Sequence, residues 1–560
     1  MTVTESKLHR GQHLLEVRNL GVDFKTSEGV VHAVRDVSFH VDRGETLAIL
    51  GESGSGKSVS SAAIMGLIDM PPGRIASGEI LFDGQDLLTI TDAKRREING
   101  RRIAMIFQDP LAALNPVYSV GWQTREALAA HHLHAGHERE IATSLFEKVG
   151  IPDPALRGAD YPHQFSGGQR QRVMIAMAIA TTPDLLIADE PTTALDVTVQ
   201  AQILALLKRL QAETGMGLIL ITHDLGVATE IADRVVVMQH GEVVEAGKVR
   251  DVLTTPRHPY TQRLVDAMPG RHGFPKARKS QAQSEVLIEV RDLVKEYGRT
   301  RGFGPTPAAF RAVDSVNLSL HKGETLAIVG ESGSGKSTLA RTLLGLDQPT
   351  SGQVLYRGKN LEQLSSKDLF AFRRRIQVVF QDPTASLNPF MNIHQIISEP
   401  WTIHRDVLPK AQWKARVGQL LERVGLSPEH ALRYPHQFSG GQRQRIAIAR
   451  AMALEPEVIV CDEAVSSLDV SVQAQIIELL DGLRRDYRLS FLFIAHDLPV
   501  VREFADRVLV MRQGKIIEEG LVADVFDHPQ HPYTRELLAA SLSLKVVRDL
   551  NPVNAVATVP

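Results

Sequence analysis

Short apolar runs recur at matching places in the two halves of the chain, and glycine or an acidic residue usually follows them. The runs are ETLAIL at 45–50, DLLIADE at 184–190 and LILITHD at 218–224, with counterparts at 324–329, 457–463 and 491–497. Parallel strands that are covered on both faces read as continuous apolar runs of this kind. The pattern therefore predicts a set of buried parallel strands in each half.

Two further patterns complete the predicted architecture of each half. EILFDG at 79–84 and VLYRG at 354–358 alternate between apolar and polar residues and end in glycine turns. Such segments are typical of antiparallel strands with one solvated face. The segments 110–161 and 383–434 have helical patterns and interrupt the order of apolar runs. We expect an α/β fold in each half, with a mainly parallel core sheet, an antiparallel flank and an inserted helical subdomain.

The matching segments keep an almost constant separation along the chain: the second half gains six residues before its glycine loop, through a short insertion at 298–310, and loses six after it. Constant spacing over many motifs indicates duplication of one ancestral domain rather than chance matches. The insertion is rich in glycine and proline and predicts a surface loop. The polar stretch at 271–285 has no apolar periodicity and predicts a linker. The predicted domains are 1–270 and 286–545, followed by a tail at 546–560 without an assigned role.

Composition places the chain among ordinary globular proteins. Of 560 residues, 43% are hydrophobic and 23% charged, and 63 basic against 65 acidic side chains leave a net charge of −2. A near-neutral chain has no global attraction to nucleic acid. The single cysteine, Cys461, excludes an internal disulfide and fits a reducing cytosol. The first residues lack the apolar core of a secretory signal, and no run approaches the ~20 residues that span a bilayer.

The octapeptide GESGSGKS occurs at 51–58 and again at 330–337, each time directly after an apolar run. Its glycines let backbone N–H groups curl around phosphate oxygens, and the helix that follows adds the positive end of its dipole. The lysine of such a loop reaches the β and γ phosphates, and the next serine ligates Mg²⁺. A glycine-rich turn without a ligand is the alternative, which the repetition disfavours. The candidate phosphate-binding residues are Gly51, Glu52, Ser53, Gly54, Ser55, Gly56, Lys57, Ser58 and Val59, with Gly330, Glu331, Ser332, Gly333, Ser334, Gly335, Lys336, Ser337 and Thr338.

Acidic, amide and imidazole side chains follow the other apolar runs. An aspartate at a strand end can hold Mg²⁺, and an adjacent glutamate can polarise the attacking water. Glutamine in the paired sequences IFQDP and VFQDP is expected near the metal or that water, and histidine after the third run is expected to contact the γ-phosphate. Surface turns and structural histidines are the alternatives. The candidates are Asp189, Glu190, Gln108 and His223, with Asp462, Glu463, Gln381 and His496.

The dodecapeptide YPHQFSGGQRQR is found unchanged at 161–172 and 434–445. Ser-Gly-Gly at the start of a predicted helix offers a hydroxyl and unobstructed N–H groups to an anion. A serine that only caps the helix is the structural alternative, and it explains the twelve-residue identity poorly. We therefore expect Ser166, Gly167, Gly168 and Gln169 to bind nucleotide, together with Ser439, Gly440, Gly441 and Gln442.

With SGGQ between a glycine loop and a strand ending in Asp-Glu, the chain resembles the ATP-binding cassette ATPases over roughly residues 13–541. The resemblance implies two tandem P-loop NTPase cassettes with RecA-like core sheets, packed head to tail. Each ATP would lie between the P-loop of one cassette and the signature of the other, so Lys57 would share a site with Ser439 and Lys336 with Ser166. Phe24 and Tyr297 match the aromatic residue that stacks on adenine. Asp196 and Asp469 match the loop that crosses between sites.

Further motifs are similar to the dipeptide and oligopeptide importer branch of that family. They are QDPxxxLNP, the segments PTTALDVTVQAQIL and EAVSSLDVSVQAQII, and the paired HPYT at His258 and His531. The resemblance implies ATP and Mg²⁺, two membrane-spanning permease subunits, an extracytoplasmic binding protein and a peripheral place on the cytoplasmic face of the cell membrane. It implies import of di- or oligopeptides or glutathione. Nickel or another small solute remains an alternative, as does a soluble tandem cassette acting on ribosomes or DNA.

Several residues depart from the pattern or have simpler explanations. Val59 lacks the hydroxyl of Thr338, Ala464 replaces the proline at Pro191, and a lone Cys461 cannot hold an iron–sulfur cluster. We expect both ATP sites to remain competent. The histidines at 131–137 predict a solvated turn rather than a metal site, and the arginines at 373–375 a solvated helical face.

Overall fold

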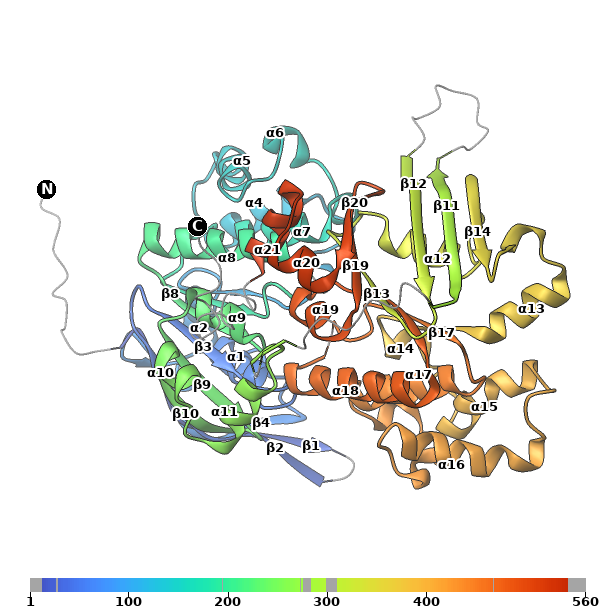
Figure 1. The fold of residues 1–560 in the computed structure, drawn as a ribbon. Helices are drawn as coiled ribbons and strands as arrows, with labels where there is room; N and C mark the ends of the chain where they lie inside the picture. Colours follow the sequence, from blue (N-terminus) through green and yellow to red (C-terminus); the bar gives the residue numbers. More distant parts are fainter. Residues whose placement is uncertain are drawn as a thin grey trace, which may run out of the picture. The chain divides into compact units, whose positions relative to one another are not determined.

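The structure is a computed structural model that describes residues 13–26, 29–193, 195–271, 273–274, 284–298, 310–466 and 468–541. The chain forms two compact units, which divide between Asp266 and Ala267 except that Asp196–Thr198 is grouped with the second unit, and each is described by itself. Figure 1 colours the first unit blue to green and the second mostly yellow to red. The predicted tail lies outside the described residues, as do most of the predicted linker and of the loop at 298–310.

Two sheets form the first unit. The larger has the strand order β10-β9-β3-β8-β7-β6, and its neighbours are parallel except for β9 and β10. The smaller is antiparallel, with the order β2-β1-β4-β5. The strands are β1 (Leu15–Thr26), β2 (Gly29–Val41), β3 (Thr46–Leu50), β4 (Gly73–Phe82), β5 (Gln85–Asp86), β6 (Ile103–Ile106), β7 (Leu185–Asp189), β8 (Gly217–Thr222), β9 (Arg234–Gln239) and β10 (Glu242–Lys248). The predicted parallel runs and antiparallel flank are confirmed.

The helices of the first unit fall into a core set and an inserted set. The core set comprises α1 (Lys57–Met65), α2 (Asp92–Ile98), α7 (Gly167–Ile179), α8 (Val197–Thr214), α9 (Leu225–Ile231), α10 (Val249–Thr254) and α11 (Pro259–Asp266). The inserted set comprises α3 (Pro110–Ala113), α4 (Val120–Ala130), α5 (Glu138–Lys148), α6 (Pro154–Arg157) and the 3-10 turn η1 (Pro162–Gln164). Leu128 of α4 and Phe146 of α5 are fully buried, and α4 and α5 contact each other and the core helix α7.

The second unit repeats this architecture. Its larger sheet has the order β16-β17-β18-β13-β19-β20 and its antiparallel sheet the order β12-β11-β14-β15. The strands are β11 (Val286–Tyr297), β12 (Phe310–His321), β13 (Thr325–Val329), β14 (Ser351–Tyr356), β15 (Lys359–Asn360), β16 (Ile376–Val379), β17 (Val458–Asp462), β18 (Ser490–Ile494), β19 (Arg507–Arg512) and β20 (Lys515–Leu521). Every residue of β13 and β18 is buried, as the apolar runs predict.

The helices of the second unit also repeat those of the first. They are α12 (Lys336–Leu343), η2 (Leu361–Gln363), α13 (Ser366–Arg375), α14 (Pro383–Ser386), α15 (Ile393–Ile403), η3 (Lys410–Gln412), α16 (Trp413–Arg423), η4 (Pro428–Leu432), η5 (Pro435–Gln437), α17 (Gly440–Met452), α18 (Val470–Tyr487), α19 (Leu498–Phe504), α20 (Val522–Asp527) and α21 (Pro532–Ala540). The inserted helices α15 and α16 contain Trp401 and Trp413, whose rings lie 5.9 Å apart. Trp401 is fully buried and donates to the carbonyl of Ala453.

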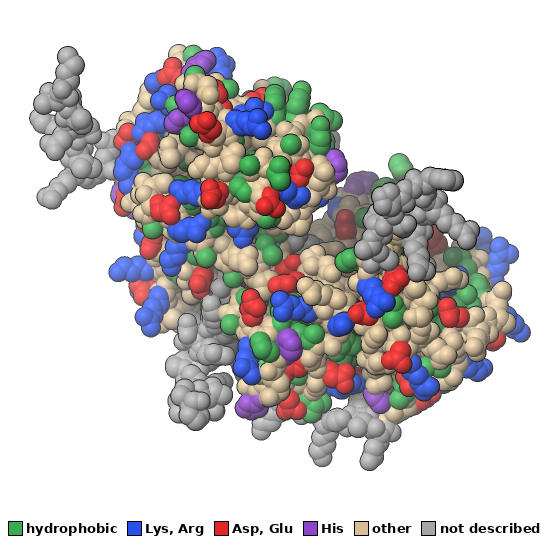
Figure 2. All heavy atoms as spheres, turned by 90° about the horizontal axis from the view of Figure 1, so that it is seen from above, with side chains coloured by type: hydrophobic (Ala, Val, Ile, Leu, Met, Phe, Trp, Pro, Cys, Tyr) green, Lys and Arg blue, Asp and Glu red, His purple; other side chains and the backbone are tan. Residues whose placement is uncertain are grey.

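Surface charge and helix length agree with the sequence analysis. On the face shown in Figure 2, lysine and arginine side chains lie interspersed with aspartate and glutamate. Within the described ranges, every helix is too short or too polar to cross a bilayer.

Of the arginines at 373–375, Arg374 pairs with Asp406 at 3.0 Å and Arg375 with Glu457 at 3.2 Å. Cys461 is a buried free thiol on β17, and burial raises its pKa.

Candidate functional site

In the first unit the predicted catalytic residues all follow the carboxyl ends of neighbouring parallel strands. The P-loop follows β3, Asp189 ends β7, His223 follows β8, and Gln108 follows β6. Because these strands are adjacent in the order β3-β8-β7-β6, their carboxyl ends meet at one edge of the sheet. Ligand sites of open α/β sheets lie at this edge. The second unit has the same arrangement in the order β13-β18-β17-β16.

In each P-loop the lysine ammonium is held by backbone carbonyls. Lys57 Nζ donates to Gly51 O at 2.7 Å and to Glu52 O at 2.9 Å, and only 6% of Lys57 is exposed. Lys336 makes the same two bonds, to Gly330 O at 2.7 Å and Glu331 O at 2.9 Å. A phosphate bound there would place its negative charge beside each buried ammonium and form charge-assisted hydrogen bonds with it.

The loop glycines and serines add to the fit with a phosphate group. Gly56 and Gly335 have φ angles of 99° and 104° at the starts of α1 and α12. Residues with a Cβ rarely adopt this backbone conformation, so the loop requires glycine there. In the described residues, the hydroxyls of Ser55 and Ser334 are buried without a hydrogen-bond partner. Orphaned buried hydroxyls of this kind indicate a site adapted to a polar ligand.

Each predicted metal-binding serine faces the aspartate at the end of the neighbouring strand. Ser58 Oγ donates to Asp189 Oδ1 at 3.2 Å, and Ser337 Oγ donates to Asp462 Oδ1 at 3.5 Å. Burial raises the pKa of both Asp189 and Asp462. A raised pKa means that a nearby cation would stabilise the ionised carboxylate. This hydroxyl and carboxylate pair supplies hard oxygen ligands suited to Mg²⁺.

The glutamate after each aspartate occupies a strained turn. Glu190 and Glu463 have φ angles of 47° and 49°, a region that residues with a Cβ rarely adopt. In the first unit, Glu190 Oε2 accepts from Gln108 Nε2 and Thr193 Oγ1, both at 2.9 Å, and Oε1 lies 3.1 Å from His223 Nδ1. Burial raises the pKa of Glu190, but His223 and Thr193 outweigh burial and lower it to about 2.

The second glutamate has the same partners at different distances. Glu463 Oε2 accepts from Gln381 Nε2 at 2.7 Å and lies 3.7 Å from His496 Nδ1. His496 lowers the pKa of Glu463 and outweighs the effect of burial, which raises it. The hydroxyl of Ser466, which corresponds to Thr193, donates instead to the backbone carbonyl of Glu463.

The signature serines cap the helices that follow them. Ser166 Oγ accepts from Gln169 N at 3.3 Å while Gln169 Oε1 accepts from Ser166 N at 3.1 Å, which is a complete capping box at the start of α7. Ser439 and Gln442 repeat it at the start of α17. Ser166 and Ser439 are exposed. The capping alternative is therefore present in both signatures, and an exposed cap remains available to a ligand.

The second glycine of each signature is required by packing. A Cβ on Gly168 would overlap Val199 Cγ1, and a Cβ on Gly441 would overlap Val472 Cγ1. The first glycine has more room, because a Cβ on Gly167 would lie 3.8 Å from Leu195. The two glycines therefore differ in role, and the sequence pattern alone treats them alike.

The predicted adenine-stacking aromatics lie on the antiparallel sheets. Phe24 is half-buried near the end of β1, where Gly73 of β4 pairs with it. Tyr297 ends β11 with 43% of its surface exposed, and its hydroxyl donates to Asp347 at 3.2 Å. Lys295 Nζ lies 5.2 Å from the centre of the Tyr297 ring. The hydrogen bonds described above for the P-loop lysines and for the glutamates do not involve Phe24 or Tyr297. The role of these two rings in stacking on adenine therefore stays a prediction.

The structure adds two residues that sequence reasoning did not assign to the site. The hydroxyl of Tyr260 accepts from Glu52 N at 3.0 Å, and that of Tyr533 accepts from Glu331 N at 3.1 Å. Both tyrosines belong to the HPYT segments, about 200 residues after the P-loops they contact. Only the repetition of HPYT in the two halves gave a signal.

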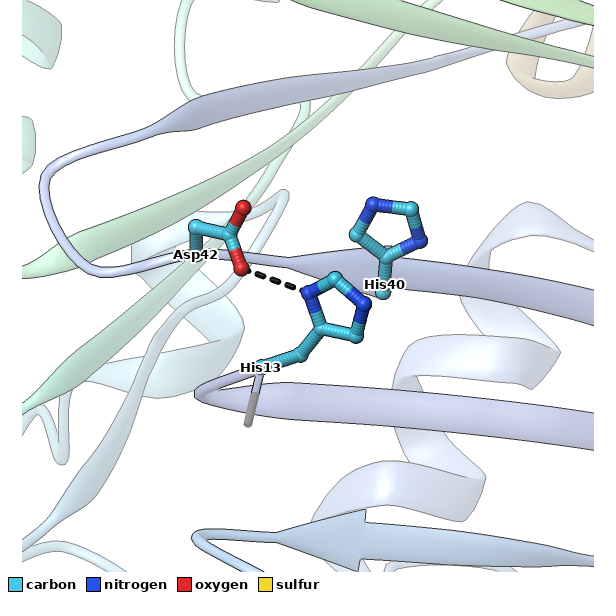
Figure 3. Close-up of side chains that lie close together, drawn as sticks. All are labelled: His13, His40 and Asp42. Atoms are coloured by element: carbon cyan, nitrogen blue, oxygen red, sulfur yellow. Dashed lines mark hydrogen bonds and ion pairs between the residues drawn. The ribbon is translucent and has the colours of Figure 1, made fainter. Parts of the chain in front are cut away.

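A cluster of His13, His40 and Asp42 lies apart from this chemistry on the first antiparallel sheet (Figure 3). Their ligand atoms lie within 4.8 Å of one another, and within the described ranges they are the one such group of three. The imidazoles stack at 3.8 Å, Asp42 Oδ1 bonds His13 Nδ1 at 2.6 Å, and Arg234 Nη1 donates to His40 Nε2 at 2.9 Å. Each imidazole therefore already has a hydrogen-bond partner in the protein, so hydrogen bonding explains the cluster. The histidines at 131–137 form no such group.

The fold and both sites define a pair of P-loop nucleotide-binding cassettes in a single chain, each with a signature helix and an inserted helical subdomain. The family profile described as ABC transporter matches residues 34–193 and 313–466. A second profile, described as the C-terminal region of oligopeptide/dipeptide transporters, matches 244–290 and 517–556. The chain therefore belongs to the ATP-binding cassette transporter family, and it is an ATPase subunit that binds nucleotide.

Relatives agree with this assignment over nearly the whole chain. The glutathione import ATP-binding proteins GsiA of Escherichia coli O157:H7 and Shigella flexneri are each 47% identical, over 94% of this chain and 89% of their own length. Among solved structures, the ATP-binding cassette MJ0796 bound to ADP and Pi is 29% identical. The match covers 42% of this chain and 99% of the MJ0796 chain, with a TM-score of 0.38.

Proposed function

We propose that the chain is the energy-coupling ATPase of an importer for glutathione or for di- or oligopeptides. The observation that supports this class of protein is the set of residues at the carboxyl edge of the larger sheet in each unit, which we call the catalytic edge. Each catalytic edge brings together a P-loop lysine, an Asp-Glu pair, a glutamine and a histidine. The cargo is supported by the 47% identity to glutathione import ATP-binding proteins. It is supported further by the two C-terminal regions typical of oligopeptide and dipeptide transporters.

The ATP sites of the proposal are composite. Each P-loop with its catalytic edge would act with the signature of the other cassette, so Lys57 would act with Ser439 and Lys336 with Ser166. The supporting observation is that each signature serine is exposed at a helix start, where N–H groups favour an anion. In a K336A chain, ATP binds only at the first P-loop. There S439R should weaken binding, whereas S166R should not, and equal effects of the two would contradict the composite arrangement.

Glu190 and Glu463 would position the attacking water. The water oxygen attacks the γ-phosphorus, the bond to the β-phosphate oxygen breaks, and the proton of the water passes to the carboxylate or to solvent. In the nucleotide-free chain a pKa of about 2 makes Glu190 ionised and weakly basic. Bound phosphates add negative charge, which raises the pKa of a nearby carboxylate toward that of a useful base. Gln108 and His223 hold the carboxylate in place.

The magnesium ion of the proposal would be held by Ser58, Asp189 and Gln108 in the first cassette and by Ser337, Asp462 and Gln381 in the second. The hydroxyl and carboxylate oxygens described above match its preference for hard ligands. Bound there, the ion would neutralise charge on the β and γ phosphates. Chelation with EDTA should therefore stop hydrolysis and leave the fold, measured by circular dichroism, unchanged.

The partners of the proposal are two membrane-spanning permease subunits and an extracytoplasmic binding protein, with this chain on the cytoplasmic face of the membrane. ATP would favour the closed pair of cassettes, and its differential affinity for that state would do the work of transport. Purified chain joined to its permeases in vesicles should hydrolyse ATP faster when binding protein loaded with glutathione or peptide is present. Hydrolysis without dependence on loaded binding protein would contradict the proposal. Stimulation by a nickel-loaded binding protein would indicate that the transported solute is a metal ion rather than a peptide.

A further inference from the structure

The HPYT segment of each unit packs back onto the P-loop of the same unit. Tyr260 is 2% exposed in α11, and Tyr533 is 2% exposed in α21. Their hydroxyls accept from the backbone N–H groups of Glu52 and Glu331. The same contact therefore forms twice, between matching residues of two units that were built from separate stretches of sequence.

The bonded N–H belongs to the peptide group that also holds the P-loop lysine. In the peptide unit between Gly51 and Glu52, the carbonyl oxygen accepts from Lys57 Nζ at 2.7 Å and the N–H donates to Tyr260 at 3.0 Å. The unit between Gly330 and Glu331 is held in the same way, by Lys336 at 2.7 Å and Tyr533 at 3.1 Å. Rotation of this peptide would break both bonds together.

The residue before this N–H must be glycine. Gly51 and Gly330 have φ angles of 156° and 148°, and a Cβ at either would overlap the carbonyl of Met238 or Met511. With no side chain at the glycine, the orientation of the peptide depends on its own hydrogen bonds. The tyrosine is thus the partner that decides which way its N–H points.

The rest of HPYT holds the tyrosine in place. His531 Nδ1 accepts from Tyr533 N at 3.1 Å and caps α21, and Pro532 occupies the first helical turn. Both carboxylate oxygens of Glu518 accept backbone N–H groups, from Gln530 at 2.7 Å and from His531 at 3.0 Å. Glu245 does the same for Arg257 and His258 in the first unit. The segment is anchored to strands β10 and β20, so its tyrosine is a fixed acceptor.

We propose that Tyr260 and Tyr533 are positioning residues for nucleotide binding, which orient the first peptide of each P-loop and, through it, the lysine that meets the phosphates. The inference rests on the proposed nucleotide sites and gives the HPYT segment a part in them. Burial raises the pKa of Tyr533 to about 12, so its hydroxyl stays neutral and can accept from an N–H throughout the physiological range.

The test replaces the hydroxyl and keeps the ring. In a full-length K57A chain, which leaves the second P-loop to bind ATP, Y533F should weaken ATP binding roughly 5- to 30-fold, because the half-buried N–H of Glu331 loses its partner. Titration with ATP measures it, and hydrogen exchange should show a less protected P-loop peptide. In the otherwise unsubstituted chain, Y260F/Y533F should raise the KM for ATP and leave kcat at saturating ATP within about twofold.

Tyr356 provides a matched control in the same unit. Its hydroxyl donates to Glu457 at 2.8 Å, away from the P-loop, and burial raises its pKa to about 12 as well. Y356F should reduce stability without changing ATP affinity. Unchanged affinity in Y533F, or equal losses in Y533F and Y356F, would overturn the inference. Failure of the parent K57A chain to bind ATP would instead refute the nucleotide site itself, and with it the inference.

Discussion

Each cassette has the same candidate catalytic residues at the carboxyl edge of its own larger sheet, but the two cassettes hold the glutamate differently. Glu190 is fixed by Gln108 and Thr193 at 2.9 Å and by His223 at 3.1 Å. Glu463 is bonded to Gln381 at 2.7 Å, while His496 lies 3.7 Å away. A duplicated motif can therefore keep every candidate catalytic residue and still differ in the side chains that orient them. The first site has the more rigid glutamate.

The largest test of the comparison removes each carboxylate in turn. E190Q and E463Q should each lower turnover about 10²-fold or more at their own site, because the group that polarises water is lost. ATP affinity should be unchanged, since the P-loop lysines and serines are intact. Single-turnover hydrolysis and ATP titration measure the two quantities. A variant that hydrolyses at the parental rate would show that its site is not catalytic in the proposed way.

Signature packing provides a second test, in which the two cassettes should behave alike. G168A and G441A should each destabilise their own unit by about 1–3 kcal/mol, because the new Cβ would come within 2.5 Å of Val199 Cγ1 or of Val472 Cγ1. G167A and G440A are the controls, since a Cβ there meets leucine at 3.8 Å and 3.7 Å. Hydrogen exchange of α7 and α17 reports each unit separately. Equal tolerance of all four alanines would contradict the packing explanation.

Much of the fold and of the site was predictable because it depends on local patterns. The buried strands β3, β7 and β8 were evident as apolar runs, and the candidate residues after them were evident from motifs repeated in the two halves. The contact of Tyr260 with the P-loop was not predictable, because it joins segments about 200 residues apart. The different bonds of Thr193 and Ser466 were not predictable either, since both carry a hydroxyl and only the rotamer decides which oxygen it meets.

Acid should weaken the first catalytic edge, and His223 should account for much of the effect. The pKa of Glu190 is lowered to about 2 from 4.5 in the unfolded chain. Its contribution to stability is therefore present above about pH 4.5 and is lost as the pH falls toward 2. H223Q should reduce that contribution by about 1–2 kcal/mol and flatten the loss between pH 5 and 2.

The matching histidine of the second cassette should have a smaller effect. His496 also lowers the pKa of its glutamate, but from 3.7 Å. H496Q should therefore change the acid dependence of its unit in the same direction and by less. Hydrogen exchange of β7 and β17 across this pH range measures both. A larger change for H496Q than for H223Q would show that the two distances do not rank the two interactions.

The smallest predicted effect concerns a hydroxyl group that makes different hydrogen bonds in the two sites. Thr193 donates to the carboxylate of Glu190, whereas Ser466 donates to the backbone of Glu463. T193A should therefore free one carboxylate oxygen and slow hydrolysis at the first site about fivefold, the value of one hydrogen bond of about 1 kcal/mol. S466A should leave hydrolysis at the second site nearly unchanged, because its glutamate keeps the bond to Gln381. The comparison is made with each site isolated by a lysine variant of the other. If S466A slowed hydrolysis as much as T193A, both hydroxyls would have to reach the glutamate during turnover, and the difference between the cassettes would belong only to the nucleotide-free state.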